Sequence, residues 1–243
     1  MIAGSGGALA GRTALVTGAS RGIGAEIARA LAAGGARVAL VARTQSALEA
    51  LAGEIGGDAL VVAGDLSQEA SLSKAATAVR DAFGGPPDIL VNNAGVFRIV
   101  ALESMEPADF SAMLRLNLLA PFLVSREFLP AMRARGSGHV ITIGSIADRV
   151  IYAGNGAYSA SKFGMRAIHE VLREETRGSG IKATLVSPAS VDTDIWDPIR
   201  FPGESASPDR SGMMDPAAVA DAVLYAVTRP SGVNIDELRL SRA

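Results

Sequence analysis

The sequence has no cysteine among its 243 residues, and this absence excludes several kinds of chemistry. Disulfide bonds, thiol nucleophiles and cysteine-ligated metals are ruled out, and a chain without cysteine suits a reducing compartment, so we expect a cytoplasmic protein. The two histidines, His139 and His169, lack the spacing of a metal site, so we expect no metal. Aromatic residues make up only 5% of the chain, which is typical of helices packed closely on a sheet.

The chain also has little net charge and no long apolar run. A formal net charge of −2 provides no basic surface for nucleic acid or for an anionic membrane. No apolar run reaches the roughly 18 residues that a membrane-spanning helix needs. Residues 1–11 are small and have no basic start, so we expect a loose N-terminus rather than a signal peptide, followed by one domain over residues 12–243.

Short apolar segments alternate with helical patterns along that domain. A continuous apolar run is typical of a strand buried on both faces of a parallel sheet. The expected strands are 12–17, 37–42, 59–63, 88–91, 140–144, 181–187 and 234–240, and the expected helices are 25–33, 46–55, 67–83, 107–132, 156–177 and 216–228. The predicted fold class is therefore α/β, a single-domain Rossmann fold with a doubly wound parallel sheet of six or seven strands and helices on both faces.

A glycine-rich segment, Gly18-Ala19-Ser20-Arg21-Gly22-Ile23-Gly24, connects the first expected strand to the first expected helix. Glycine lets backbone N–H groups approach phosphate oxygens, and the N-terminus of a helix carries a partial positive charge. A plain turn has a similar composition, but the strand-turn-helix setting favours a dinucleotide site. The spacing of the glycines is that of a variant Rossmann fold.

The end of the second expected strand favours NADP(H) over NAD(H). An NAD site normally has a carboxylate here for the ribose 2′-hydroxyl, whereas an arginine accommodates the 2′-phosphate of NADP. No acidic residue occupies positions 41 to 46; Arg43 lies there instead, and Arg21 could reach the same phosphate. After the third expected strand, Asp65 could accept a hydrogen bond from the adenine amino group or cap the next helix.

Tyr158 and Lys162 are four residues apart and share one face of the expected helix 156–177. A nearby ammonium favours the phenolate, so we expect Lys162 to lower the pKa of Tyr158 from its usual value of about 10. The pair could then exchange a proton with a hydroxyl or carbonyl substrate. Pro121, inside the expected helix 107–132, predicts a kink that frees the backbone carbonyl of Asn117 to bind water or a side chain; alternatively, Asn117 only packs against a neighbouring helix.

Several motifs together resemble the short-chain dehydrogenase/reductase family from residue 12 onwards: residues 17–24, Asn92-Asn93-Ala94-Gly95, Asn117, Ser145, Tyr158-Ser159-Ala160-Ser161-Lys162 and residues 188–193. The resemblance implies hydride transfer between NADP(H) and a ketone, an aldehyde or a secondary alcohol, without a metal, in a homodimer or homotetramer. It also implies that Tyr158 is the general acid or base and that Ser145 binds the substrate oxygen. Lys162 would lower the pKa of Tyr158 and bind the nicotinamide ribose, and Asn117 would hold a water.

The cofactor-binding residues implied by the same resemblance are Gly18, Ser20, Arg21, Gly22, Ile23, Gly24, Arg43, Asp65, Leu66, Asn92, Ala94, Gly95, Tyr158, Lys162, Pro188, Val191 and Thr193. Two departures from the family pattern stand out. Ala189 replaces the usual glycine, and we expect cofactor binding to survive. The segment 233–240 lacks the glycine-rich end of typical 3-oxoacyl-acyl-carrier-protein reductases, which makes that activity the alternative. A non-catalytic NADP(H) sensor is the alternative from another class, but the presence of all four proton-handling residues favours an enzyme.

The substrate is less well defined by the sequence. The expected substrate loop covers about residues 189–214, because a long irregular segment in a compact domain is usually a lid or binding loop. In this loop, Trp196 either covers an apolar substrate or anchors the loop to the core. Ser145, Tyr158 and Trp196 are the expected substrate-binding residues. Arg98 or Arg149 could attract an acidic substrate, although a solvent-facing arginine is the simpler interpretation of each.

Overall fold

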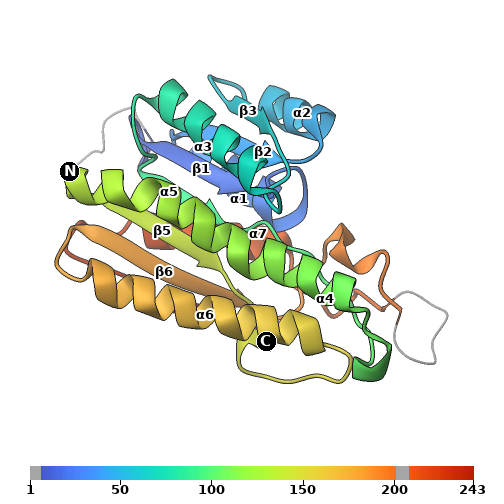
Figure 1. The fold of residues 1–243 in the computed structure, drawn as a ribbon. Helices are drawn as coiled ribbons and strands as arrows, with labels where there is room; N and C mark the ends of the chain where they lie inside the picture. The colour runs from blue at the N-terminus through green and yellow to red at the C-terminus, as the bar shows by residue number, and fades with distance from the viewer. Residues whose placement is uncertain (1–6, 201–207) are drawn as a thin grey trace.

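The structure is a computed structural model that describes residues 7–200 and 208–243. Seven parallel strands form one sheet in the order β3-β2-β1-β4-β5-β6-β7 (Figure 1). The strands are β1 (Thr13–Thr17), β2 (Arg37–Ala42), β3 (Leu60–Ala63), β4 (Ile89–Asn92), β5 (Gly138–Ile143), β6 (Ile181–Pro188) and β7 (Glu237–Leu240). The predicted parallel α/β sheet is confirmed, with seven strands.

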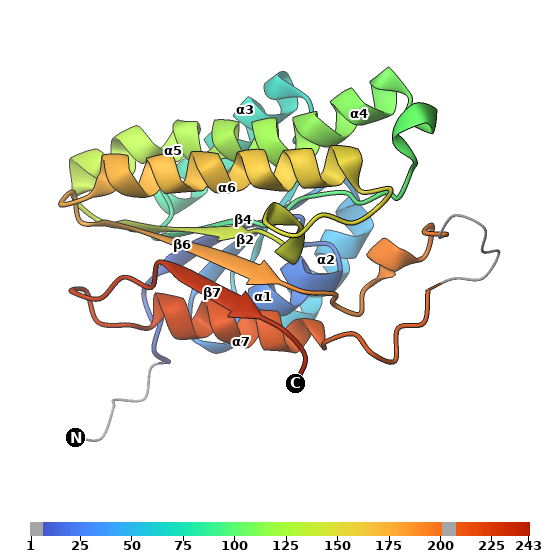
Figure 2. The same ribbon diagram turned by 90° about the horizontal axis from the view of Figure 1, so that it is seen from below.

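Helices cover both faces of the sheet, with α3, α4, α5 and α6 on one side and α1, α2 and α7 on the other (Figure 2). Their bounds are α1 (Gly22–Ala33), α2 (Gln45–Ile55), α3 (Glu69–Phe83), α4 (Pro107–Leu114), α5 (Ala120–Arg135), α6 (Gly156–Thr176) and α7 (Pro216–Val227), with short 3₁₀ turns η1 (Leu102–Ser104), η3 (Ile146–Asp148) and η4 (Asp194–Trp196). Within residues 7–200 and 208–243, no helix combines the length and the apolarity that crossing a membrane requires.

The apolar strands hold the two helical layers together. All four residues of β4 are buried, as are five of the six residues of β2. Ile27 of α1 and Val223 of α7 belong to the apolar cluster on one face, and Leu72 of α3 and Phe128 of α5 to the cluster on the other. Each such buried side chain contributes about 1.5–3 kcal/mol. The sheet is therefore a rigid platform whose strand ends hold the loops in place.

The topology of the sheet places two of the predicted motifs side by side. β1 pairs with β2 on one side and with β4 on the other, so the direction of winding reverses between β1 and β4. Doubly wound sheets bind ligands at the carboxyl ends of the strands that flank this reversal. Here the glycine turn 18–24 follows β1, and Asn93-Ala94-Gly95 follows β4.

The long helix expected over residues 107–132 is interrupted. α4 ends at Leu114, and a π-helical turn η2 (Arg115–Leu119) follows, in which the N–H of Ala120 donates to the carbonyl of Arg115. α5 then continues to Arg135. Pro121 lies in the first turn of α5, where a missing backbone N–H costs little. The predicted irregularity is present, but as a π-helical turn of the kind often found at functional sites.

The N-terminal segment is less loose than the sequence predicts. Leu9 is fully buried in the core, and its N–H donates to the carbonyl of Gly34 at 2.8 Å. Arg12 follows and donates to the carbonyl of Val227 at 3.0 Å. A single large apolar side chain anchors this stretch. Because the residues around it are small, they form no apolar pattern from which the anchor could be predicted. Residues 1–6 of the expected loose N-terminus lie outside the described residues.

Candidate active site

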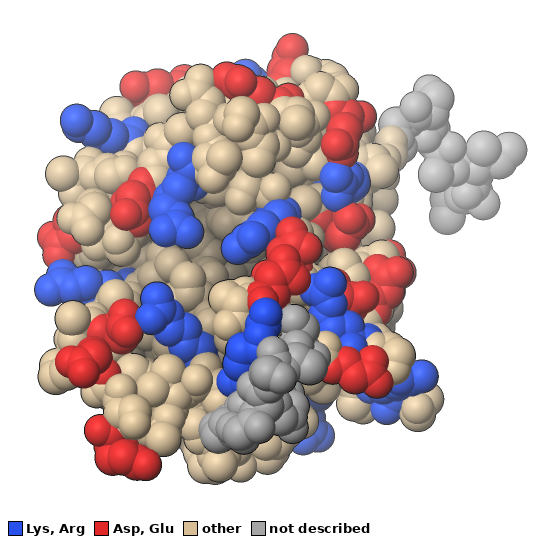
Figure 3. Space-filling view, turned by 90° about the vertical axis from the view of Figure 1, so that its right-hand side faces the viewer, with Lys and Arg blue, Asp and Glu red and all other residues tan. Residues whose placement is uncertain are grey.

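A cavity of about 810 Å³ opens at the carboxyl ends of the strands. Figure 3 looks onto this end of the molecule, which is hollowed near its middle. The predicted site residues that line the cavity are Gly18, Ser20, Arg21, Gly22, Ile23, Gly24, Arg43, Asp65, Leu66, Ala94, Gly95, Ser145, Tyr158, Lys162, Pro188, Val191, Thr193 and Trp196. Asn92 and Asn117 do not line it and lie behind its wall. The fold thus brings nearly all of the predicted residues to one cavity.

The glycine turn is packed so tightly that larger residues do not fit. Gly18 and Gly22 have φ angles of +67° and +55°, in the left-handed region that favours glycine. A Cβ atom on Gly18 would lie 2.8 Å from Cα of Ala94, and one on Gly24 would lie 2.2 Å from the carbonyl oxygen of Gly18. The backbone of the turn is therefore open to the cavity, and α1 begins at its end with its N-terminal N–H groups.

The side chain of Asn93 holds this turn against the end of β4. It donates to the carbonyl oxygens of Thr17 at 2.9 Å and Gly18 at 3.2 Å, while its backbone N–H donates to Oγ1 of Thr17 at 3.0 Å. This role of Asn93 was not expected from the sequence, where Asn92 was the predicted cofactor-binding residue. Neighbouring side chains point in opposite directions, and Asn92 faces α5, where its Nδ2 donates to Oγ of Ser125 at 2.9 Å.

Two cations line the part of the cavity next to the glycine turn. Arg21 and Arg43 are exposed, and neither guanidinium group forms a hydrogen bond or ion pair with a residue in the described part of the chain. Asp65 is engaged locally, since its Oδ1 accepts from the N–H of Ser67 at 3.0 Å and from its hydroxyl at 2.8 Å. These bonds, and the charge of Arg43, lower the pKa of Asp65. Unpaired guanidinium groups beside a glycine turn fit a ligand that carries phosphates.

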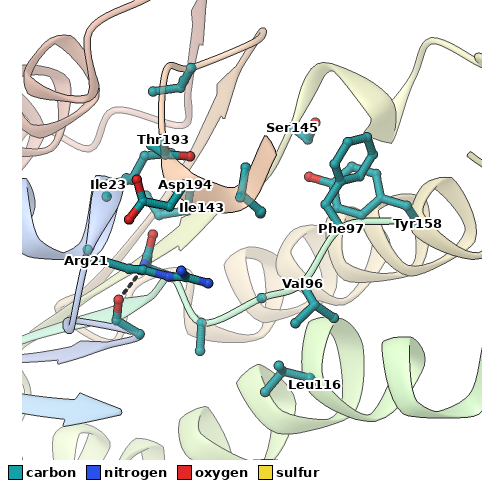
Figure 4. Close-up of a pocket in the computed structure, with 18 of the residues that line it drawn as sticks. Arg21, Ile23, Val96, Phe97, Leu116, Ile143, Ser145, Tyr158, Thr193 and Asp194 are labelled. Carbon is teal, nitrogen blue, oxygen red and sulfur yellow. Dashed lines mark hydrogen bonds between the residues drawn. The ribbon is translucent and has the colours of Figure 1, made fainter. Parts of the chain in front are cut away.

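Tyr158 lies in the first turn of α6 and faces the cavity beside Ser145, which follows β5 and caps the 3₁₀ turn η3 (Figure 4). Burial raises the pKa of Tyr158, a hydrogen bond with Ser145 acts in the opposite direction, and the negative charge of Asp148 raises the pKa further. The expected lowering by Lys162 is therefore wrong for the protein alone. Removing the phenolate from water raises the pKa by more than the hydrogen bond with Ser145 lowers it.

Lys162 is almost fully buried, and its ammonium points towards β5. Nζ donates to the carbonyl of Ile143 at 3.0 Å and lies 5.7 Å from the centre of the Tyr158 ring. Burial lowers the pKa of Lys162 to about 8, although Asp148 acts in the opposite direction. This ammonium lies at the wall of the cavity, and its burial makes it a weaker base than an exposed lysine.

Asn117 connects the segment after β4 to α6. Its Oδ1 accepts from the N–H of Val96 and its Nδ2 donates to the carbonyl of Val96, both at 2.8 Å. Nδ2 also donates to Oγ of Ser161 at 3.1 Å, and Ser161 in turn donates to the carbonyl of Tyr158 at 2.6 Å. The side chain of Asn117 thus fixes the wall on both sides of Tyr158, and its water-holding role stays a prediction.

Asp148 is a buried carboxylate that the sequence analysis did not single out. It is completely inaccessible to solvent and accepts from Oγ of Ser187 at 2.7 Å and from Nε of Arg149 at 2.6 Å. Arg149 also pairs with Glu237 of β7. Gly144 makes room for this network, because a Cβ there would lie 2.7 Å from Oγ of Ser187. Local sequence could not reveal this role of Asp148, since its partner Ser187 belongs to the distant strand β6.

The remaining part of the cavity is lined by aromatic and aliphatic side chains, as Figure 4 shows for Val96, Phe97 and Leu116. The ring of Phe97 packs edge-on against Tyr158 with centroids 4.7 Å apart and against Trp196 with centroids 5.1 Å apart. Nε1 of Trp196 donates to the carbonyl of Val191 at 2.9 Å. Trp196 is thus anchored to the backbone and also lines the cavity, and its contact with a substrate stays a prediction. Phe97 was missed because one aromatic residue in a loop has no distinctive pattern.

The substitution at position 189 is accommodated without backbone strain. Among the described residues, only glycines have a positive φ angle, so Ala189 is in an ordinary conformation. Its N–H donates to the carbonyl of Leu240 at 2.8 Å, and the residue lines the cavity. Residues 201–207 of the expected substrate loop lie outside the described part of the chain.

Comparison with known proteins agrees with this geometry. The model of the family described as short chain dehydrogenase matches residues 12–202. An uncharacterized oxidoreductase of Staphylococcus haemolyticus is 34% identical over 95% of this chain and 96% of its own. A glycine betaine reductase of Emericella nidulans is 37% identical over 96% of this chain, but the match spans only 19% of that longer protein. A metagenomic short-chain oxidoreductase, solved in complex with NADP, is 38% identical, with a TM-score of 0.83 over 97% of this chain and 100% of the other.

Proposed function

The chain belongs to the short-chain dehydrogenase family, and we propose that it is an NADP(H)-dependent oxidoreductase that interconverts a ketone or aldehyde with its alcohol. The observation that carries this proposal is the meeting of Tyr158, Ser145 and Lys162 on the wall of one cavity whose other end is the glycine turn. A polar, proton-exchanging group thus lies within the same enclosed space as a site for a dinucleotide.

The choice of NADP(H) rests on Arg21 and Arg43. A 2′-phosphate adds about two negative charges to the ribose, and two guanidinium groups without described partners can bind it. The similar metagenomic oxidoreductase was solved with NADP, which supports the same choice. When bound, the nicotinamide supplies or accepts a hydride at the substrate carbon.

Tyr158 handles the proton of the reaction. Its raised pKa keeps the phenol protonated at neutral pH, so in the direction of reduction its hydroxyl can give a proton to the substrate oxygen. The hydroxyl of Ser145 donates a hydrogen bond to the same oxygen and stabilises its developing negative charge. Lys162 binds the ribose hydroxyls and supplies positive charge near the phenol. Asn117 keeps α6 and the segment at Val96 in register, and it holds the water that passes protons to Lys162.

We also propose that the protein acts in the cytoplasm as a homodimer or homotetramer. The outer faces of α5 and α6 carry the exposed apolar side chains Phe122, Phe163 and Val171. Burying such side chains against a second copy removes apolar surface from water, which favours association.

The test is the replacement of Tyr158 by phenylalanine. Tyr158→Phe keeps the ring that packs against Phe97 and removes only the hydroxyl. We expect the rate of NADPH-dependent ketone reduction to fall by about 10²- to 10⁴-fold, while the dissociation constant for NADPH stays within about threefold. The matched control is Tyr225→Phe in α7, a half-exposed tyrosine, which should keep full activity. Retained turnover in Tyr158→Phe would refute the proposal.

A further inference from the structure

We infer that the substrate carbonyl carries an uncharged, apolar and ring-sized substituent, which packs against Phe97 and Trp196. This inference rests on the proposed function and specifies its substrate class. It makes carbonyl compounds that carry a carboxylate poor substrates. An aryl ketone such as acetophenone represents the favoured class, and 4-acetylbenzoate, the same molecule with an added carboxylate, represents the disfavoured class.

Aromatic side chains lie directly beside the reacting group. Phe97 lies between Tyr158 and Trp196, with edge-on packing on both sides. A substrate whose oxygen contacts the Tyr158 hydroxyl must therefore place one substituent beside Phe97. Aromatic pairs of this kind favour a flat apolar group by about 0.5–1.5 kcal/mol beyond its burial. The indole of Trp196 is held by its hydrogen bond to Val191, so this wall is preorganised.

Few charged side chains line the cavity. The described lining residues that carry charge are Arg21, Arg43, Asp65, Lys162 and Asp194. Figure 4 shows Asp194 beside Arg21 and Thr193, at the end of the cavity away from Tyr158 and Phe97. The lining residues nearest to Phe97 in the chain, Val96 and Ile99, are apolar. The cation nearest to Tyr158, Lys162, is almost fully buried, and its Nζ already donates to the carbonyl of Ile143. A carboxylate placed beside Phe97 would therefore lose its hydration without gaining a free cation.

The two arginines that the sequence offered for an acidic substrate are used elsewhere. Arg98 does not line the cavity and forms an ion pair with Asp109 at 2.9 Å. Arg149 is bound to Asp148 and Glu237. The hydrogen bond to Asp148 raises the pKa of Arg149 most, and the bond to Glu237 raises it further. Recruiting either arginine for a substrate would require breaking an existing ion pair.

Two large apolar side chains are exposed in the segments that flank this wall. Ile151 and Leu102 are 70% and 74% exposed, although large apolar side chains are usually more buried. Ile151 precedes the lining residue Tyr152, and Leu102 packs over Gly156 at the start of α6. Neither side chain lines the cavity, so the substrate class rests on Phe97 and Trp196.

Binding can be measured without turnover, because Trp196 is the only tryptophan in the chain and its fluorescence reports on this wall. The full-length protein is saturated with NADP⁺, which has no hydride to give, and titrated with acetophenone or 4-acetylbenzoate. We expect saturable fluorescence changes with a dissociation constant for acetophenone at least about tenfold lower, a difference of about 1.4 kcal/mol. Equal or tighter binding of 4-acetylbenzoate, or no saturation by acetophenone, would overturn the inference.

Two variants and a control complete the test. Phe97→Ala should weaken acetophenone binding by about three- to tenfold, and Tyr225→Ala, far from the cavity, should leave it unchanged. Ile195→Arg places a cation beside Trp196 and should shift preference towards 4-acetylbenzoate. Unchanged acetophenone binding in Phe97→Ala, or an unchanged preference in Ile195→Arg, contradicts the assignment of the wall. A different result would refute the proposed function itself, namely no binding of NADPH or continued ketone reduction by Tyr158→Phe. Turnover of carboxylated ketones in preference to aryl ketones would keep the function and reject the substrate class.

Discussion

The two parts of the cavity are built in different ways. Next to the glycine turn, the wall consists of backbone, small residues and two arginines, all supplied by the ends of adjacent strands. Around Phe97, the wall consists of large side chains on loops that follow β4, β5 and β6. The first part suits a dinucleotide, whose phosphates can contact the backbone. In the second part, single side chains can be replaced without disturbing the sheet.

The largest effect is expected where backbone forms the wall. Gly24→Ala places a Cβ 2.2 Å from the carbonyl oxygen of Gly18 and 2.4 Å from Nδ2 of Asn93, so the turn must move. We expect the free energy of unfolding to fall by about 1–3 kcal/mol and NADPH binding to be lost. Thermal unfolding and cofactor titration measure both. The matched control is Gly53→Ala in α2, where a Cβ meets nothing within 4 Å and should stabilise by up to about 1 kcal/mol.

A smaller effect is expected for Arg43→Asp, which acts on one group of the ligand. Losing a charge-assisted hydrogen bond costs about 1.5–3 kcal/mol, so the preference for NADPH over NADH should fall by about 10- to 150-fold. The ratio of kcat/KM for the two cofactors is the measurement. Lys74→Asp, on the exposed face of α3, makes the same change in net charge and should leave the ratio unchanged. If both variants behave alike, Arg43 does not bind the phosphate.

The smallest effect is expected for Asp148, which is fully buried and does not line the cavity. Its charge raises the pKa of Tyr158 and of Lys162, so Asp148→Asn should lower both. Alcohol oxidation needs the Tyr158 phenolate, and its pH profile should therefore move to lower pH in this variant. Glu237→Gln, which changes the outer end of the same network and keeps the Asp148 charge, should not move it. A profile that stays in place in Asp148→Asn would contradict the electrostatic role.

The contrast also explains which parts of the site the sequence could predict. Gly18, Gly24 and Arg43 follow strands at fixed local offsets, so a pattern of a few residues identifies them. Phe97, Asn93 and Asp148 depend on contacts between segments far apart in the chain, such as Asp148 with Ser187 of β6. The pKa of Tyr158 was predicted in the wrong direction for the same reason, because spacing shows the neighbouring Lys162 but not the depth of burial.

The central claim is that the two parts of the cavity meet at Tyr158, and a crystal structure of the protein with NADP⁺ and acetophenone tests it most directly. The account predicts the cofactor along the glycine turn with its 2′-phosphate on Arg43, the ketone oxygen within hydrogen-bond distance of the Tyr158 and Ser145 hydroxyls, and the phenyl ring against Phe97 and Trp196. A ketone oxygen away from Tyr158, or a phosphate away from both Arg21 and Arg43, would contradict it.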